Sequence, residues 1–202
     1  MKIILKQVER VFDEFLKIDR AVIQFEKFDG TMTDDIVRFT MNRGDSVAAL
    51  LLNRDTHKLI FTKQFRYPAY AHDEKNGWLL EIVAGIIEHN NDPDRTIINE
   101  IYEEVGYQVS TVEKIRCFYT TPGSNSEQVH LYYAEVTNDQ KINEGGGLDR
   151  ETEYIQAIEM PIEDAFQLLD RNEIKDAKTI IALQWLRAKN NDRRSAPFQK
   201  TI

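Results

Sequence analysis

The stretch GIIEHNNDPDRTIINEIYEEVGY, residues 85–107, decides the fold of this chain. Asp92 followed by Pro93 is typical of a helix start, because aspartate caps free backbone amides and proline suits the first helical position. Gly106 is typical of a helix end, since glycine readily adopts the left-handed conformation found there. We therefore predict a strand ending at Gly85, a loop, and a helix that runs to Val105.

Three glutamates of this predicted helix lie on one face. Glu100, Glu103 and Glu104 stand at positions i, i+3 and i+4, which are neighbours on a helix surface. Their like charges repel each other, so a bound cation would stabilise the helix. Mg²⁺ prefers oxygen ligands and is usually held by a few carboxylates together with substrate phosphates. The spacing indicates a metal site, and a solvated acidic face is the alternative.

Length, composition and charge narrow the class of protein. A chain of 202 residues with 42% apolar residues suits one domain with a small additional element at one end. Twenty-six basic against thirty-four acidic residues give a net charge of -8, which disfavours non-specific nucleic-acid binding. An anionic substrate would therefore need local neutralisation, for which a metal ion is suited.

Cysteine usage and the N-terminal residues bear on the compartment. Cys117 is the single cysteine, so no disulfide can form within the chain, which fits a reducing environment. Its apolar neighbours predict that its side chain is buried. Residues 1–12 resemble neither a signal peptide nor a membrane span, and we expect a cytoplasmic protein that does not contact membranes.

Patterning along the rest of the chain predicts the α+β class, with a mixed sheet. Residues 22–40 indicate a β-hairpin that turns at Asp29-Gly30, residues 67–77 are irregular, and the tail from Asn190 is expected to be disordered. The predicted divisions are an N-terminal β extension over 1–42, a main domain over 43–189 and a polar tail over 190–202. Further strands are predicted at 46–52, 58–66, 78–84, 113–120, 129–136 and 155–159, and helices at 161–169 and 176–188.

The stretch 85–107 resembles the Nudix box, G-x5-E-x7-R-E-U-x-E-E-x-G-U, in which U is a bulky apolar residue. Asn91 replaces the first glutamate of the pattern, and Asn99 replaces its arginine. Both ends of a possible charge pair are thus neutral, which leaves no unpaired charge but puts the catalytic rate in question. The five fixed letters that match are Gly85, Glu100, Glu103, Glu104 and Gly106.

The resemblance extends over residues 43–186 and is greatest to the branch with GDP-mannose hydrolases, UDP-glucose pyrophosphatases and ADP-ribose pyrophosphatases. It implies an α/β/α sandwich with an N-terminal β-hairpin extension that packs across a homodimer. It also implies hydrolysis of a nucleoside diphosphate sugar to a nucleoside monophosphate and a sugar 1-phosphate, with Mg²⁺ or Mn²⁺. The segments that carry it are KQFRYP at 63–68, LEIVAG at 80–85, YTTPG at 119–123, GGGL at 145–148 and KT at 178–179.

The same resemblance assigns roles to individual residues. Glu151 or Glu153, on the loop after three glycines, would be the catalytic base, and a solvated acidic loop is the alternative. Arg66 and Glu81 would bind the substrate, against a surface arginine and a buried structural glutamate as alternatives. Ala84 (through its carbonyl), Glu100, Glu104 and Glu153 would hold the metal, Glu103 would act nearby in catalysis, and Glu127 would contact the substrate.

Two other functions remain open at this stage. Asn91 and Asn99 are also compatible with a catalytically impaired domain that binds nucleotide sugars as a sensor or regulator. A purely structural acidic domain is a further alternative, but it leaves the combination of strand, glycine, capped helix and three carboxylates unexplained.

Overall fold

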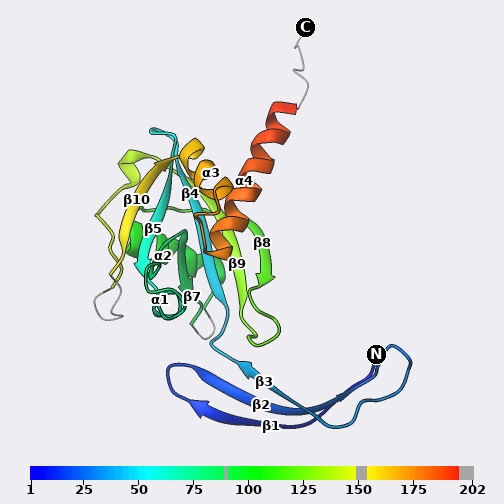
Figure 1. Ribbon diagram of the computed structural model, residues 1–202. Helices are drawn as coiled ribbons and strands as arrows, with labels where there is room; N and C mark the ends of the chain where they lie inside the picture. The colour runs from blue at the N-terminus through cyan, green and yellow to red at the C-terminus, as the bar shows by residue number, and fades with distance from the viewer. Residues whose placement is uncertain (89–90, 149–153, 196–202) are drawn as a thin grey trace. The chain divides into compact units, whose positions relative to one another are not determined.

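The computed structural model describes residues 1–88, 91–148 and 154–195 (Figure 1). The chain folds as two units. Residues 1–45 and 118–129 form the first unit, and residues 46–117 together with 130–202 form the second.

The first unit contains a three-stranded antiparallel sheet of β1 (Ile3–Asp13), β2 (Lys17–Phe25) and β3 (Ile36–Met41). Strands β2 and β3 form the predicted hairpin, and Gly30 has the positive φ of 82° that its turn requires. The additional strand β1 was not predicted. The extension is therefore a three-stranded sheet and not a simple hairpin.

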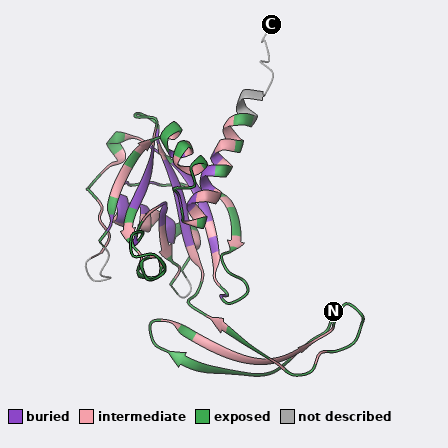
Figure 2. Ribbon diagram, viewed as in Figure 1, coloured by how far each residue is buried: buried purple, intermediate pink, exposed green. Residues whose placement is uncertain are grey.

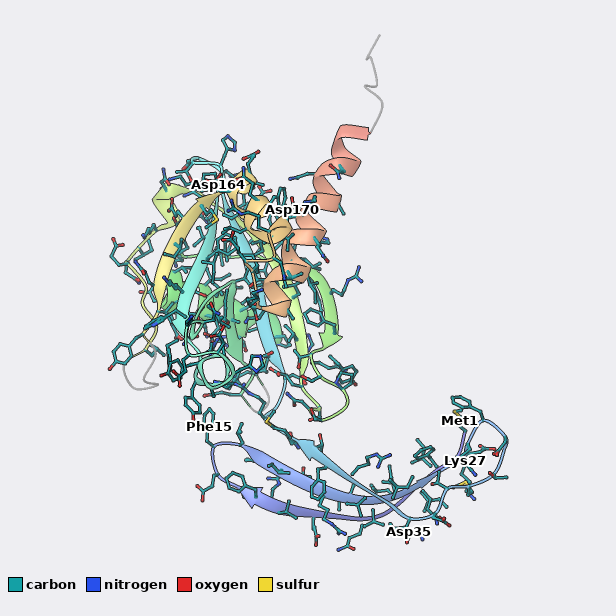
Figure 3. All side chains as sticks on the ribbon, viewed as in Figure 1. Met1, Phe15, Lys27, Asp35, Asp164 and Asp170 are labelled. Carbon is teal, nitrogen blue, oxygen red and sulfur yellow. The ribbon has the colours of Figure 1, made fainter. Side chains whose placement is uncertain are left out.

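The sheet of the first unit has no buried face of its own. None of the residues of β1, β2 and β3 is buried, as Figure 2 shows, whereas the central strands of the second unit contain many buried residues. The labelled Phe15 lies at one end of this sheet, and Met1, Lys27 and Asp35 lie toward the other (Figure 3). Large apolar side chains that remain exposed on these strands are Ile3, Leu5, Val8, Val11, Phe12, Val37 and Phe39.

The main sheet is mixed and seven-stranded, in the order β10-β5-β4-β9-β8, with β6 paired to β5 and β7 paired to β4. The chain changes neighbour at Ile82, so the single strand predicted for residues 78–84 is two short strands. The bounds are β4 (Ser46–Asn53), β5 (Lys58–Phe65), β6 (Trp78–Glu81), β7 (Val83–Ile86), β8 (Glu113–Tyr119), β9 (Gln128–Val136) and β10 (Gln156–Pro161).

Helices cover both faces of this sheet (Figure 1). Helix α2 (Pro93–Val105) covers one face, where its Ile97 and Ile101 join a buried cluster with alternate residues of β4. Helix α4 (Ala177–Ser195) lies on the other face, together with α3 (Ile162–Asp170). The predicted α+β sandwich is therefore confirmed.

Other local predictions differ from the structure. Residues Tyr67–His72 form the short helix α1, in a segment predicted to be irregular, and Asn138–Gln140 form a 3-10 helix. Helix α4 continues to Ser195, so the segment after Asn190 is not disordered from its start. Cys117 is exposed and not buried. Among the described residues, no helix is long and apolar enough to span a membrane.

Candidate functional site

Helix α2 begins and ends at the predicted residues. The side chain of Asp92 accepts a hydrogen bond from the backbone N–H of Asp94 at 3.1 Å, and Gly106 ends the helix with a φ of 76°. The buried hydroxyl of Tyr132 donates to the Asp94 carboxylate at 2.6 Å. Burial and this hydrogen bond raise the pKa of Tyr132, so the hydroxyl stays protonated and holds the start of α2 against β9.

Two of the glutamates on α2 reach strand β7. Glu104 is 3% exposed, and its carboxylate accepts a hydrogen bond from the backbone N–H of Ala84 at 3.2 Å. A Cβ atom on Gly85 would lie 2.0 Å from the Glu100 carboxylate, so only glycine lets this side chain lie against the strand. The local sequence thus brings two carboxylates to the backbone of residues 84 and 85.

The carboxylate oxygens of Glu100 and Glu104 are the kind of ligand that a hard cation such as Mg²⁺ prefers. Two partly or fully buried carboxylates lie one helical turn apart, and such a pair repels unless a positive charge is placed between them. Within the described part of the chain, no three acidic, histidine or cysteine side chains stand together as a complete metal site. A metal held by Glu100 and Glu104 would therefore need additional ligands.

The three glycines before the acidic loop pack against the end of α2. Gly146 donates its N–H to the Glu104 carbonyl at 3.0 Å, and Gly147 donates to the Glu103 carbonyl at 3.2 Å. A Cβ atom on Gly145 would lie 2.3 Å from the Glu104 carbonyl oxygen. Gly146 and Gly147 thus satisfy two of the backbone carbonyls that the end of α2 leaves without a partner in the helix.

The two glutamates expected to act in catalysis follow these glycines in the sequence. Glu151 and Glu153 lie outside the described residues, so their assignment as base and metal ligand stays a prediction. Glu103 lies on α2 beside the two carboxylates described above and is partly buried. Its role in catalysis likewise stays a prediction.

A buried cluster of charges lies at the end of β6. The carboxylate of Glu81, 2% exposed, accepts hydrogen bonds from Arg66 Nε at 2.9 Å and Arg66 Nη2 at 3.0 Å. It also accepts one from Lys178 Nζ at 2.5 Å. Burial alone would raise the pKa of Glu81, but the hydrogen bonds from Arg66 and the charge of Lys178 outweigh it and lower the pKa to about 2.

The start of α4 completes this cluster. The carboxylate of Asp176 accepts from Lys178 Nζ at 2.8 Å, and from the backbone N–H and hydroxyl of Thr179 at 2.9 and 2.6 Å. The hydroxyl of Thr179 in turn accepts the N–H of Ile82 at 2.9 Å. Asp176 and Lys178 were not among the predicted site residues. An aspartate directly before an amphipathic helix is a cap signal, which indicates the helix start but not its charged neighbours.

A family model for the NUDIX domain matches residues 42–183. The chain belongs to the Nudix family. Its curated relatives include a GDP-mannose pyrophosphatase of Cronobacter sakazakii, 35% identical over 183 residues that cover 89% of this chain and 94% of that protein. A GDP-mannose pyrophosphatase of Pectobacterium atrosepticum is 36% identical over 172 residues, which cover 85% of this chain and 87% of that protein. The resemblance stated from the sequence is confirmed.

The fold of this Nudix chain is also that of a solved structure. The crystal structure of an ADP compounds hydrolase superposes with a TM-score of 0.71 and covers 97% of this chain and 98% of that one. The two sequences are 17% identical, so this likeness bears on the fold alone.

The two departures from the Nudix box lie around one cavity. Asn91 and Asn99 line a cavity of about 330 Å³ together with Arg95 and Thr96. Arg95 precedes Asn99 by four residues, so the two side chains are neighbours on the helix surface. The positions that carry opposite charges in the family pattern thus face a shared polar space, in which Arg95 is the one charged side chain among the described residues.

Glu127 belongs to the first unit of the Nudix chain. Its carboxylate accepts a hydrogen bond from the Asn125 side chain at 3.2 Å, and its N–H donates to the Asn125 side-chain oxygen at 3.0 Å. The predicted contact of Glu127 with a substrate stays a prediction.

Proposed function

We propose that this Nudix chain hydrolyses the diphosphate of a nucleoside diphosphate sugar, of the GDP-mannose, UDP-glucose or ADP-ribose type, to a nucleoside monophosphate and a sugar 1-phosphate. The observation that carries the proposal is the convergence of Glu100 and Glu104 on the backbone at Gly85. The curated relatives named as GDP-mannose pyrophosphatases support this class of substrate.

An arginine suited to the diphosphate lies within electrostatic reach of these carboxylates. Burial lowers the pKa of Arg66, but its hydrogen bonds to Glu81 and the charges of Glu81, Glu104 and Asp176 raise it overall. Arg66 is therefore permanently charged, and a guanidinium matches the geometry of phosphate oxygens. In the proposed complex it binds the substrate diphosphate on the side opposite to Glu81.

The carbonyl of Ala84 and the carboxylates of Glu100, Glu104 and Glu153 would hold Mg²⁺, or Mn²⁺. The bound metal would offset the charge of the diphosphate and lower the pKa of a water molecule. Glu151 or Glu153 would accept the proton of the attacking water, with Glu103 beside the reacting groups. Arg66 would keep the diphosphate in place while the bond to the leaving phosphate breaks.

The direct test is product release from a panel of GDP-mannose, UDP-glucose, ADP-ribose and ADP-glucose with Mg²⁺. We expect a monophosphate and a sugar phosphate from at least one member, and none when EDTA removes the metal. Chromatography of the products identifies the bond that is cleaved. Release of inorganic phosphate alone, or no reaction with any member, would contradict the proposal.

A second candidate function is supported by the cavity at Asn91 and Asn99, where the charges of the family pattern are missing. In that case the chain binds a nucleotide sugar without cleaving it, as a sensor or regulator. The panel separates the two candidates: thermal stabilisation by one nucleotide sugar in the absence of any product would favour binding alone.

We also propose that the three-stranded sheet of the first unit is covered by a second copy of the chain. A sheet needs a packed apolar face for stability, and none of the residues of β1, β2 and β3 is buried within one chain. Val37 and Phe39 stand two residues apart on β3 and so share a face, and both are exposed. A homodimer would remove this surface from water.

Sedimentation velocity at micromolar concentration tests the dimer. We expect the parent chain to sediment as a dimer, and a Val37→Glu/Phe39→Glu double variant to sediment as a monomer because it places charge in the interface. Arg38→Glu reverses a charge on the opposite face of the same strand and serves as the matched control. A monomeric parent chain would refute the proposed dimer.

A further inference from the structure

The Glu81 carboxylate has two cations that compete for one of its oxygens. Within the part of the chain that the structure describes, its Oε1 accepts from Arg66 Nε alone, whereas Oε2 accepts both from Arg66 Nη2 at 3.0 Å and from Lys178 Nζ at 2.5 Å. The Glu81 and Lys178 side chains are 3% and 15% exposed, so water screens their attraction only weakly. A stronger pull from Lys178 would therefore weaken the bond from Nη2 of Arg66.

Asp176 offsets that pull. Lys178 Nζ lies 2.5 Å from the Glu81 carboxylate and 2.8 Å from the Asp176 carboxylate, and the Asp176 side chain is 14% exposed. The ammonium group thus divides its charge between two anions. With Asp176 included, the cluster contains two positive and two negative charges and is neutral.

Among the described residues, Glu81 occupies only one side of the Arg66 guanidinium. A guanidinium has five N–H groups, of which Nε and one on Nη2 bind Glu81. The remaining three point away from Glu81, and the Arg66 side chain is 42% exposed. The two parallel hydrogen bonds to Glu81 fix the plane of the guanidinium and hence the direction in which these three donors point.

We propose that Asp176 is a positioning residue for Arg66, acting through Lys178 and Glu81. It neutralises Lys178 so that both oxygens of Glu81 can hold the guanidinium in a single orientation toward the diphosphate. This inference rests on the proposed function only in taking the diphosphate as the ligand of Arg66. The orientation of Arg66 itself follows from the four side chains described here.

The variant Asp176→Asn isolates the charge of Asp176 from its capping role. Asparagine caps helices as well as aspartate does, so the N–H of Thr179 keeps an acceptor and α4 keeps its start. Asp170→Asn is the matched control. It removes a carboxylate at the end of α3 that is paired at 2.8 Å with Arg187 of α4, outside the cluster. Asp176→Ser, which also caps a helix, is a second variant in case the first folds poorly.

Steady-state kinetics with the cleaved nucleotide sugar give the first measurement. We expect Asp176→Asn to raise KM about tenfold and to change kcat less, with Asp170→Asn equal to the parent chain. In an Arg66→Ala background, Asp176→Asn should have no further effect, because its effect passes through Arg66. An equal loss in both backgrounds would show a general structural role and would overturn the proposal.

A second measurement needs neither substrate nor turnover. The exchange rate of the Arg66 Nε proton, followed by NMR of the ¹⁵N-labelled chain, reports how firmly Glu81 holds the guanidinium. We expect faster exchange in Asp176→Asn than in the parent chain, and no change in Asp170→Asn. Unchanged exchange overturns the positioning role. If exchange is faster in Asp176→Asn but the parent chain cleaves none of the panel, the positioning role stands and only the proposed hydrolysis is refuted.

Discussion

Glu104→Gln is expected to lower kcat for the cleaved nucleotide sugar by at least about 100-fold while the chain stays folded. Glu104 is 3% exposed and lies against the Ala84 amide, one helical turn from Glu100. Glutamine has the same shape and keeps an oxygen for that amide, but it has no charge to hold a cation. The substitution also removes like-charge repulsion on α2, so the melting temperature should change little.

The measurement pairs turnover with thermal unfolding for the parent chain and for Glu104→Gln, each with and without Mg²⁺. Stabilisation by Mg²⁺ should occur in the parent chain and be lost in the variant. Glu163→Gln, which replaces an exposed glutamate in the first turn of α3, is the control and should behave as the parent chain. Turnover within about threefold of the parent would exclude Glu104 as a metal ligand.

Glu81→Gln is expected to be the most destabilising of the substitutions considered, because it leaves two cations beside a neutral side chain. In the folded chain the pKa of Glu81 is lowered from 4.5 to about 2, which corresponds to about 3 kcal/mol of stability. The stability that comes from this lowered pKa is fully present above pH 4.5 and is lost as the pH falls toward 2. Glutamine resembles the protonated form, so the two chains should converge in that range.

Urea unfolding at pH 7, 5 and 3 checks this expectation. The difference in the free energy of unfolding between the parent chain and Glu81→Gln should be largest at pH 7 and 5 and clearly smaller at pH 3. Glu173→Gln removes an exposed ion pair with Arg171 and should cost less than about 1 kcal/mol. A difference independent of pH would show that the Glu81 charge is not the source of the stability.

Helix α2 was predictable because the signals that define it are local. Asp92, Pro93 and Gly106 act within one helical turn of the backbone they terminate, and the carboxylates share a face through helical spacing alone. Strand β1 carries no comparable signal. Its apolar residues are mixed with charged ones and become a strand only by pairing with β2, a contact between segments that the pattern of β1 does not specify.

The contacts within the charge cluster could not be predicted for the same reason, because they join segments that are distant in the sequence. Glu81 and Lys178 are 97 residues apart in the sequence. Their contact depends on how α4 packs across the sheet, which no spacing rule encodes. A substrate-binding residue and a buried structural glutamate were the alternative interpretations of Glu81. The structure shows that Glu81 is buried and that it holds Arg66, and its contact with a substrate stays a prediction.

The chain changes strand neighbour at Ile82, between the residue that holds Arg66 and the residue that meets Glu104. This limits the size of a group that could fit between Arg66 and Glu104. Glu81, which holds the guanidinium, and Ala84, which meets Glu104, are joined by only three peptide units. Three residues of extended chain span at most about 11 Å, and covalent bonds do not stretch. Because the N–H of Ile82 is also bound by Thr179, this short piece of backbone limits the distance between the proposed diphosphate-binding region at Arg66 and the proposed metal-binding region at Glu104.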